Sequence, residues 1–148
     1  VLVLFAVVAV FLLTGPKTSK YATAIVIIGD TGFEVEIADT PFLRSRGLSE
    51  RESLATRGGM IFVFPTSAVQ NFWMKGMKFP IDIIWIKEEK IVGAAMGVEP
   101  EDGPEYTIYK SPEPVDKVLE LNAGSFQKFG MRIGDMIKSI NSSPLNLD

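Results

Sequence analysis

The chain of 148 residues contains no cysteine and no histidine. Their absence excludes catalytic triads built on histidine, thiol nucleophiles, and zinc sites made from histidine or cysteine ligands. Without cysteine the chain forms no disulfide and gives no indication of its redox compartment. Any acid–base chemistry in this chain must therefore use aspartate, glutamate, lysine or tyrosine.

Clustered positive charge is also lacking. The chain has 15 lysine and arginine residues against 18 aspartate and glutamate residues, a net charge of −3. Binding to a phosphate backbone needs a basic patch or stripe, and no such stripe is visible. We therefore expect no nucleic-acid partner. Hydrophobic residues make up 47% of the chain, which is ample for the core of one domain.

One long hydrophobic run is present, from Val1 to Leu13. It is shorter than the ~20 residues that a membrane-spanning helix needs. It fits the core of a secretory signal peptide, or part of an uncleaved membrane anchor. We therefore predict a signal peptide or membrane anchor with its tether at residues 1–24, a single β domain at residues 25–141, and a flexible tail at residues 142–148. Both interpretations place the domain outside the cytoplasm, either periplasmic, secreted or anchored to the membrane.

Short strands with frequent glycine and proline dominate the remaining chain. A capping threonine and Pro41 predict a short helix that Gly47 ends, and the spacing of Ser49 and Glu52 predicts a second one. No alternation of strands with longer helices is visible. We predict a mainly β fold, an antiparallel sandwich or partly closed barrel of jelly-roll-like character with two or three short helices. The predicted strands lie at residues 24–28, 33–37, 60–64 (ended by Pro65), 72–75, 79–86, 91–98, 115–121 and 135–140.

The strand at residues 79–86 carries an unexpected charge. Alternation places Phe79, Ile81, Ile83 and Trp85 on one face, and Ile84 and Ile86 on the other face together with Asp82. A lone carboxylate in such apolar surroundings must keep its proton or find a partner, since an unpaired buried charge costs several kcal/mol. The segment around this residue is therefore the predicted site.

Two nearby side chains suggest ligand binding. Trp73 offers a face on which a sugar or another flat ligand could stack, and Lys75 could bind an anionic group. Arg46 and Glu120 are plausible neighbours of Asp82. We predict a binding pocket formed by these five residues for a small molecule, glycan or peptide, with no catalytic residue, metal or cofactor. In a purely structural alternative, the tryptophan packs in the core, the aspartate forms an ion pair with Arg46 or Lys75, and Glu120 faces water.

Other functions remain open. Asp82 and Glu120 could form the carboxylate pair of a hydrolase. Residues 124–137 resemble the closing segment of peptide-binding PDZ domains. A structural module for envelope assembly is a further alternative, and the acidic, proline-rich stretch from Glu99 to Pro114 is either a solvated connection or a lid over the pocket.

Several short motifs follow one another in a recognisable order. They are Ala38-Asp39-Thr40, Arg46-Gly47-Leu48, Gly59-Met60-Ile61-Phe62, Phe72-Trp73-Met74-Lys75, Pro80-Ile81-Asp82-Ile83-Ile84, Val118-Leu119-Glu120-Leu121 with Ala123-Gly124, and Gly134-Asp135. Over residues 33–140 the chain thus resembles the domain-of-unknown-function 192 family of bacteria and archaea. The resemblance implies a compact, mainly β domain, often behind a signal peptide or anchor, with no established activity. The chain departs from the family pattern at Ser49, where methionine is usual, and at Gly76-Met77, where Asn-Thr is usual.

Overall fold

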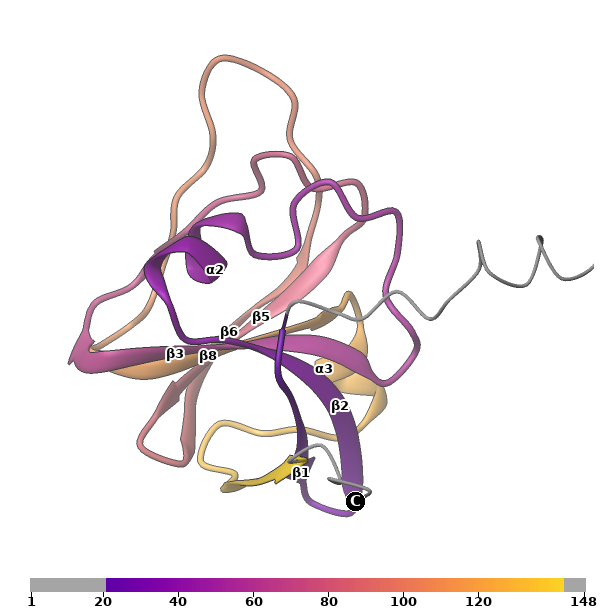
Figure 1. The fold of residues 1–148 in the computed structure, drawn as a ribbon, viewed down its shortest axis with the longest axis vertical. Coiled ribbons are helices and arrows are strands. Elements are labelled where there is room, and N and C mark those ends of the chain that lie inside the picture. Colours follow the sequence, from indigo (N-terminus) through magenta and orange to yellow (C-terminus); the bar gives the residue numbers. More distant parts are fainter. Residues whose placement is uncertain (1–20, 143–148) are drawn as a thin grey trace, which may run out of the picture.

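The computed structural model describes residues 21–142 (Figure 1). The hydrophobic run and almost all of the predicted tail lie outside the described residues. Among the residues that are described, no helix is long and apolar enough to span a membrane. The first strand begins at Thr23, two positions before the predicted start of the domain.

A seven-stranded, strongly curled sheet forms the body of the domain, in the order β6-β5-β8-β3-β2-β1-β9. β4 and β7 form a separate two-stranded ribbon. The elements of the described part are β1 (Thr23–Ile28), β2 (Thr31–Ala38), α2 (Pro41–Arg46), β3 (Gly58–Ala68), β4 (Asn71–Phe72), β5 (Ile81–Lys87), β6 (Lys90–Val98), β7 (Tyr109–Lys110), β8 (Val115–Asn122), α3 (Ser125–Lys128) and β9 (Ile137–Ser142). The mainly β class with short helices is confirmed.

The curled sheet is partly closed by the segment that leads into β9. Ile91 N–H donates to the carbonyl of Asp135 (2.9 Å), and Gly134 N–H donates to the carbonyl of Ile91 (2.8 Å). Ile137 N–H reaches the carbonyl of Glu89 (2.7 Å). These bonds join the start of β6, at one edge of the sheet, to the start of β9 at the other, so the sheet curls into a half-barrel.

One pair of strands departs from the antiparallel pattern. β2 and β3 run parallel, with Val35 beside Gly59 and Ile37 beside Ile61. A parallel pair needs a crossover, and the connection with α2 provides it. The expectation of antiparallel pairing alone is therefore wrong for β2 and β3. The sequence did not indicate this parallel pair, because α2 has only six residues and is too short to show the periodicity of a longer crossover helix.

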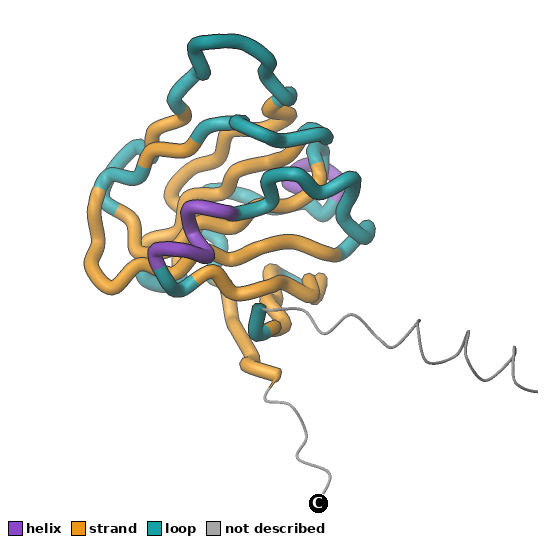
Figure 2. The backbone as a smooth tube through the Cα atoms, turned by 45° about the horizontal axis from the view of Figure 1, so that its top comes forward, coloured by secondary structure: helices purple, strands orange, loops and turns teal. Residues whose placement is uncertain are grey.

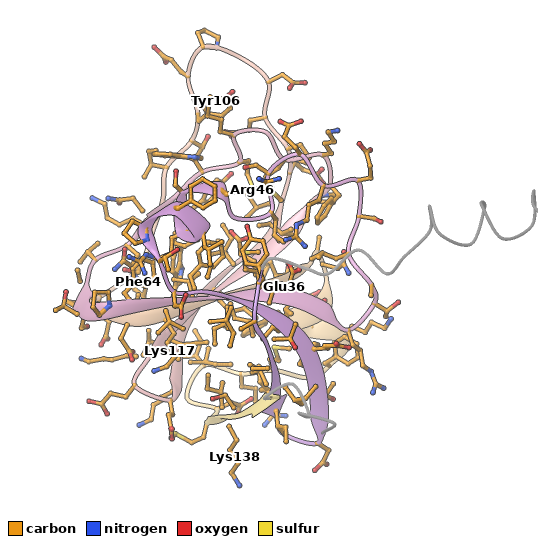
Figure 3. The ribbon with its side chains drawn as sticks, in the orientation of Figure 1. Glu36, Arg46, Phe64, Tyr106, Lys117 and Lys138 are labelled. Carbon is orange, nitrogen blue, oxygen red and sulfur yellow. The ribbon has the colours of Figure 1, made fainter. Side chains whose placement is uncertain are left out.

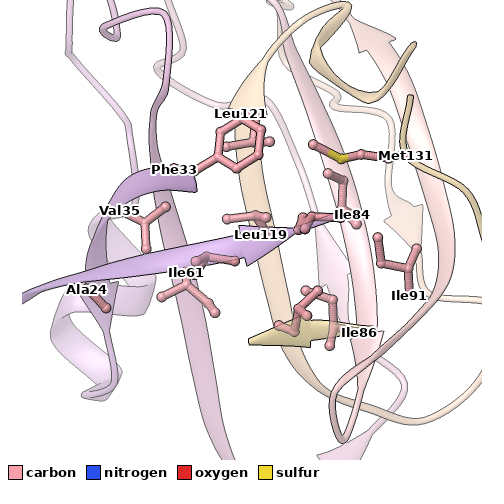
Figure 4. Close-up of a cluster of buried hydrophobic side chains, with 13 residues drawn as sticks. Ala24, Phe33, Val35, Ile61, Ile84, Ile86, Ile91, Leu119, Leu121 and Met131 are labelled. Atoms are coloured by element: carbon pink, nitrogen blue, oxygen red, sulfur yellow. The ribbon is translucent and has the colours of Figure 1, made fainter. Parts of the chain in front are cut away.

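The two faces of the sheet bury two separate cores. β5 illustrates the division, since Ile84 and Ile86 belong to one core while Ile83 and Trp85 belong to the other. The first core fills the concave side and includes Phe33, Leu119 and Met131 together with Ile84 (Figure 4). The second lies between the sheet and the layer formed by α2, β4 and β7. Its buried members are Ala38, Leu48, Met60, Phe62, Met74, Ile81, Ile83, Trp85, Val98, Val115 and Val118.

The first predicted helix is confirmed and the second is wrong. Thr40 Oγ1 accepts a hydrogen bond from Leu43 N–H (3.2 Å), and Gly47 ends α2 with a φ of +51°. No helix follows, because the side chain of Ser49 donates instead to the carbonyl of Lys75 (3.0 Å). β3 also continues through Pro65 to Ala68, since its pairing with β8 is irregular between Val63 and Ala68 and leaves the proline without a ladder bond to make.

The connection between β6 and β7 projects from the body as a long loop (Figure 2). Its end is held where β7 pairs with β4, Asn71 beside Lys110. Ser111 reinforces this junction, because its N–H donates to the carbonyl of Gln70 (3.0 Å) and its Oγ accepts from Gln70 N–H (3.0 Å). The β4–β7 ribbon therefore stands as a fixed wall over the second core.

Candidate functional site

A pocket of about 300 Å³ lies between the end of α2, β3 and the segment that follows it. We call it the α2 pocket. Figure 3 shows two of its residues, Arg46 and Phe64, on the α2 side of the sheet. Its lining comprises Arg44, Ser45, Arg46, Gly47, Leu48, Ser49, Phe62, Phe64, Gln70, Asn71, Phe72, Trp73, Met77 and Glu120.

Aromatic rings form a fixed wall of the α2 pocket. Phe62 and Phe72 meet edge to face, with ring centroids 4.9 Å apart and an interplanar angle of 83°. Phe72 in turn meets Trp85 of the second core, with centroids 5.6 Å apart. Edge-to-face contacts add to the stability that area burial provides, so this wall is preorganised.

Two arginines from the last turn of α2 line the pocket in different ways. The guanidinium of Arg44 donates to the carbonyls of Asp39 (2.6 Å) and Val63 (2.8 Å) and lies over the ring of Phe64 (5.2 Å). Arg46 is exposed, and its side chain makes no hydrogen bond or ion pair with any residue from 21 to 142. Arg44 is therefore held in place, whereas Arg46 is available to a ligand.

Glu120 is the buried acidic group of the pocket. β8 places it beside Met60 of β3 and Ile83 of β5, and only 5% of the residue is exposed. Within the described part of the chain its carboxyl has neither a hydrogen-bond partner nor an ion-pair partner. Burial raises the pKa of Glu120 from its usual 4.5 to about 8, because removal from water disfavours the charged form. At neutral pH the pocket thus contains an uncharged carboxylic acid.

Asp82 lies on the opposite face of the sheet from this carboxyl, pointing toward the first core. It is fully buried and accepts hydrogen bonds from the N–H groups of Gly97 (2.8 Å), Gly124 (3.1 Å) and Phe126 (2.8 Å). The predicted ion pair with Arg46 or Lys75 is therefore wrong, since three backbone donors replace the cation. The side chain joins β6 to the start of α3.

The hydrolase hypothesis fails because Asp82 and Glu120 lie on opposite faces of the sheet. In the pairing of β5 with β8, Ile83 lies opposite Glu120, while Asp82 lies opposite Leu121. Side chains alternate between faces along a strand, so the two carboxyl groups are separated by the sheet and cannot act on one bond. No group of three or more acidic side chains that could hold a metal ion lies within residues 21–142.

Three of the five predicted site residues come together. Arg46, Trp73 and Glu120 line the α2 pocket, whereas Asp82 and Lys75 do not. Trp73 lies just beyond β4 and is 55% exposed, so its indole is open to a ligand and is not core packing. Lys75 is exposed outside the pocket.

Several lining residues were not identified from the sequence. Phe62, Phe64 and Phe72 occur in apolar strands, where their composition does not distinguish a pocket wall from a core. Arg44 was missed although it lies in the last turn of the same short helix as Arg46, two residues earlier in the chain. None of residues 99–108 lines the pocket, so the long loop is not a lid over it in this structure.

Comparisons with known proteins give a family and a fold. The model of the DUF192 family, described as "Uncharacterized ACR", matches residues 24–139. A proposed transcription regulator from Sinorhizobium meliloti 1021 is similar in structure, with a TM-score of 0.73, 29% identity, and coverage of 84% of this chain and 98% of that chain. A protein of unknown function from Novosphingobium aromaticivorans DSM 12444 has a TM-score of 0.72, 26% identity, and coverage of 84% and 89%. No curated protein matches the chain significantly.

Proposed function

The chain belongs to the DUF192 family, as its motifs indicated, and within this family we propose that it is a binding domain for a small organic molecule in the α2 pocket. The observation that carries the proposal is the buried carboxyl of Glu120, which faces a pocket and has no partner among the described residues. The pocket is at the small end of the range of about 300–1,000 Å³ that is typical of ligand sites.

The energetic cost of this carboxyl supports a ligand. A buried polar group without a partner costs about 1–3 kcal/mol, and replacement by an apolar group of the same shape removes that cost. An apolar side chain at position 120 would match Val118, its neighbour on the same face of β8. A bound molecule that hydrogen-bonds to Glu120 offsets the cost and accounts for the acid at this position.

Binding is favoured over catalysis because no second aspartate or glutamate, and no lysine or tyrosine, of the described residues lines the α2 pocket beside Glu120. The other buried aspartate or glutamate of the described part, Asp82, lies across the sheet and is occupied by backbone donors. A PDZ-like peptide groove is disfavoured because α3, the helix of the segment that suggested it, has four residues. Such a helix is too short to form one side of a groove for an extended peptide.

We also propose that the domain works outside the cytoplasm, either exported or tethered to the membrane. The support is the apolar run from Val1 to Leu13, whose length fits the core of a signal peptide. Cell fractionation with an antibody against the domain tests this. Recovery in the periplasm, medium or membrane fraction is expected, and recovery only in the cytoplasmic fraction would contradict it.

A pair of matched tryptophan substitutions tests the binding function. Ser45→Trp fills the mouth of the α2 pocket, whereas Ser67→Trp adds the same side chain at an exposed position of β3 outside the pocket. The full chain is screened by thermal shift against small organic molecules, since a ligand at a hundred times its dissociation constant adds about 2.7 kcal/mol. Hits that Ser45→Trp abolishes and Ser67→Trp retains are expected. A screen without hits, or hits that survive in Ser45→Trp, would refute the proposal.

A further inference from the structure

We infer that the ligand is a small amphoteric molecule whose ammonium group lies against Glu120, whose carboxylate reaches Arg46, and whose apolar body packs on the aromatic wall. This inference rests on the proposed function, because it specifies the chemistry of a ligand in the same pocket.

The ammonium group follows from the inner end of the pocket. No lysine or arginine of the described residues forms an ion pair with Glu120, so its charged form gains no direct salt bridge from the protein. A ligand ammonium supplies that compensation, and charge-assisted hydrogen bonds are about twice as strong as neutral ones. The rings of Phe62 and Phe72 line the same pocket, and aromatic faces attract organic cations.

The carboxylate follows from the two guanidinium groups of α2. Neither Arg44 nor Arg46 forms an ion pair with a carboxylate of the described part. Arg44 uses its donors on backbone carbonyls, so its positive charge remains uncompensated, and Arg46 is free to make a bidentate contact. These charges repel a simple amine, whereas they attract a molecule that also carries a carboxylate.

The apolar body follows from the remaining lining. Leu48, Phe72 and Met77 line the same pocket as the charged groups, and Trp73, which is 55% exposed, lines it too. Large rigid rings favour a planar apolar partner, because stacking adds to the free energy gained from area burial. The predicted ligand thus resembles an aromatic amino acid in its distribution of charge and apolar surface.

Three related compounds separate the two charges. L-Phenylalanine carries both groups, 2-phenylethylamine carries the ammonium only, and 3-phenylpropanoate carries the carboxylate only. Titration calorimetry of the full chain, in mild detergent, measures each dissociation constant at about pH 6 and pH 7. Phenylalanine is expected to bind at least tenfold more tightly than either single-charge compound. Its affinity should rise up to tenfold from the lower to the higher pH, because Glu120 must release its proton to accept the ammonium group.

Substitutions assign each charge to its residue. Glu120→Gln keeps the shape but cannot ionise, so it should weaken phenylalanine and phenylethylamine binding, leave phenylpropanoate unchanged, and remove the pH dependence. Arg46→Gln should weaken phenylalanine and phenylpropanoate but not phenylethylamine. Arg57→Gln, an exposed arginine outside the α2 pocket, is the matched control and should change none of the three. Thermal melting confirms that each variant is folded.

The outcomes distinguish this inference from the proposed function. If phenylpropanoate binds more tightly than phenylethylamine and binding weakens as pH rises, Glu120 acts as a neutral donor and the amphoteric ligand is refuted, while the pocket remains a binding site. Failure of all three compounds to bind while other screened molecules bind in the α2 pocket also refutes the amphoteric class. Absence of any binding in the screen refutes the proposed function together with this inference.

Discussion

Replacing Glu120 by glutamine should make the domain more stable at neutral pH and flatten the pH dependence of its stability. In the folded protein the carboxyl has a pKa of about 8, whereas exposure on unfolding returns it to about 4.5. Between these values the folded protein holds a proton that the unfolded chain has released. Stability is therefore fully present below about pH 4.5 and is lost progressively as pH rises to about 8.

The size of the effect follows from the same two values. Each unit of pKa difference is worth about 1.4 kcal/mol, so the complete loss approaches about 5 kcal/mol. From about pH 5 to pH 7 the wild-type protein should lose about 2.5 kcal/mol through this group alone. Glutamine cannot lose a proton, so the variant keeps what the wild type loses.

Urea unfolding of both proteins at several pH values between about 5 and 8 measures this difference. Glu34→Gln, at an exposed position of β2, controls for the removal of one acidic residue and should keep the wild-type slope. The difference between wild type and Glu120→Gln must widen with pH. A constant difference would show that Glu120 is ionised in the folded protein, and would refute the buried, neutral acid that we describe.

Three further substitutions have expected outcomes. Asp82→Ala leaves three backbone N–H groups without their acceptor and should lower the free energy of unfolding by at least about 3 kcal/mol in urea titrations; a loss below about 1 kcal/mol would mean that water replaces the carboxylate. Gly59→Ala places a methyl group 2.5 Å from the main-chain oxygen of Glu120 and should lower the free energy of unfolding by about 1–3 kcal/mol. Gly32→Ala, whose nearest contact is at 3.5 Å, should lower it by less. Equal losses in the two variants would contradict the close approach at Gly59. Trp73→Ala should change the free energy of unfolding by no more than about 0.5 kcal/mol, because the side chain is exposed, yet it should weaken ligand binding. A large loss of stability would instead place the indole in the core.

The family, the fold class and most strands could be predicted from the sequence because these depend on local patterns. Alternation alone placed Asp82 on the face of Ile84 and Ile86, and the structure confirms it. The capping threonine and Gly47 likewise marked both ends of α2 correctly. Patterns of this kind depend on interactions between residues that are only a few positions apart in the chain, so the sequence alone shows them.

The site depended on relations between distant segments, and these could not be predicted. Whether Asp82 and Glu120 share a face is decided by the register of β5 against β8, and a shift of one residue reverses the answer. The capping pattern at Ser49 was misleading, because the Ser49 hydroxyl donates its hydrogen bond to the carbonyl of Lys75, which lies on a remote segment. A single sequence contains no information on either relation.

The position of β8 in the sheet has a consequence for the order in which the domain is assembled. β8 lies between β3 and β5, so Met60 of β3 and Ile83 of β5 are both paired with Glu120 of β8 and not with each other. Glu120 is synthesised after both of these residues. A growing chain that ends before β8 has two separate pieces of sheet with their central edges unpaired. Pairing between strands that are far apart in the sequence is slow, because the chain loses the entropy of loop closure before the stabilising contacts between the strands form. We therefore expect the seven-stranded sheet to form only after β8 has been synthesised, because β8 joins β5 and β6 to β3, β2 and β1.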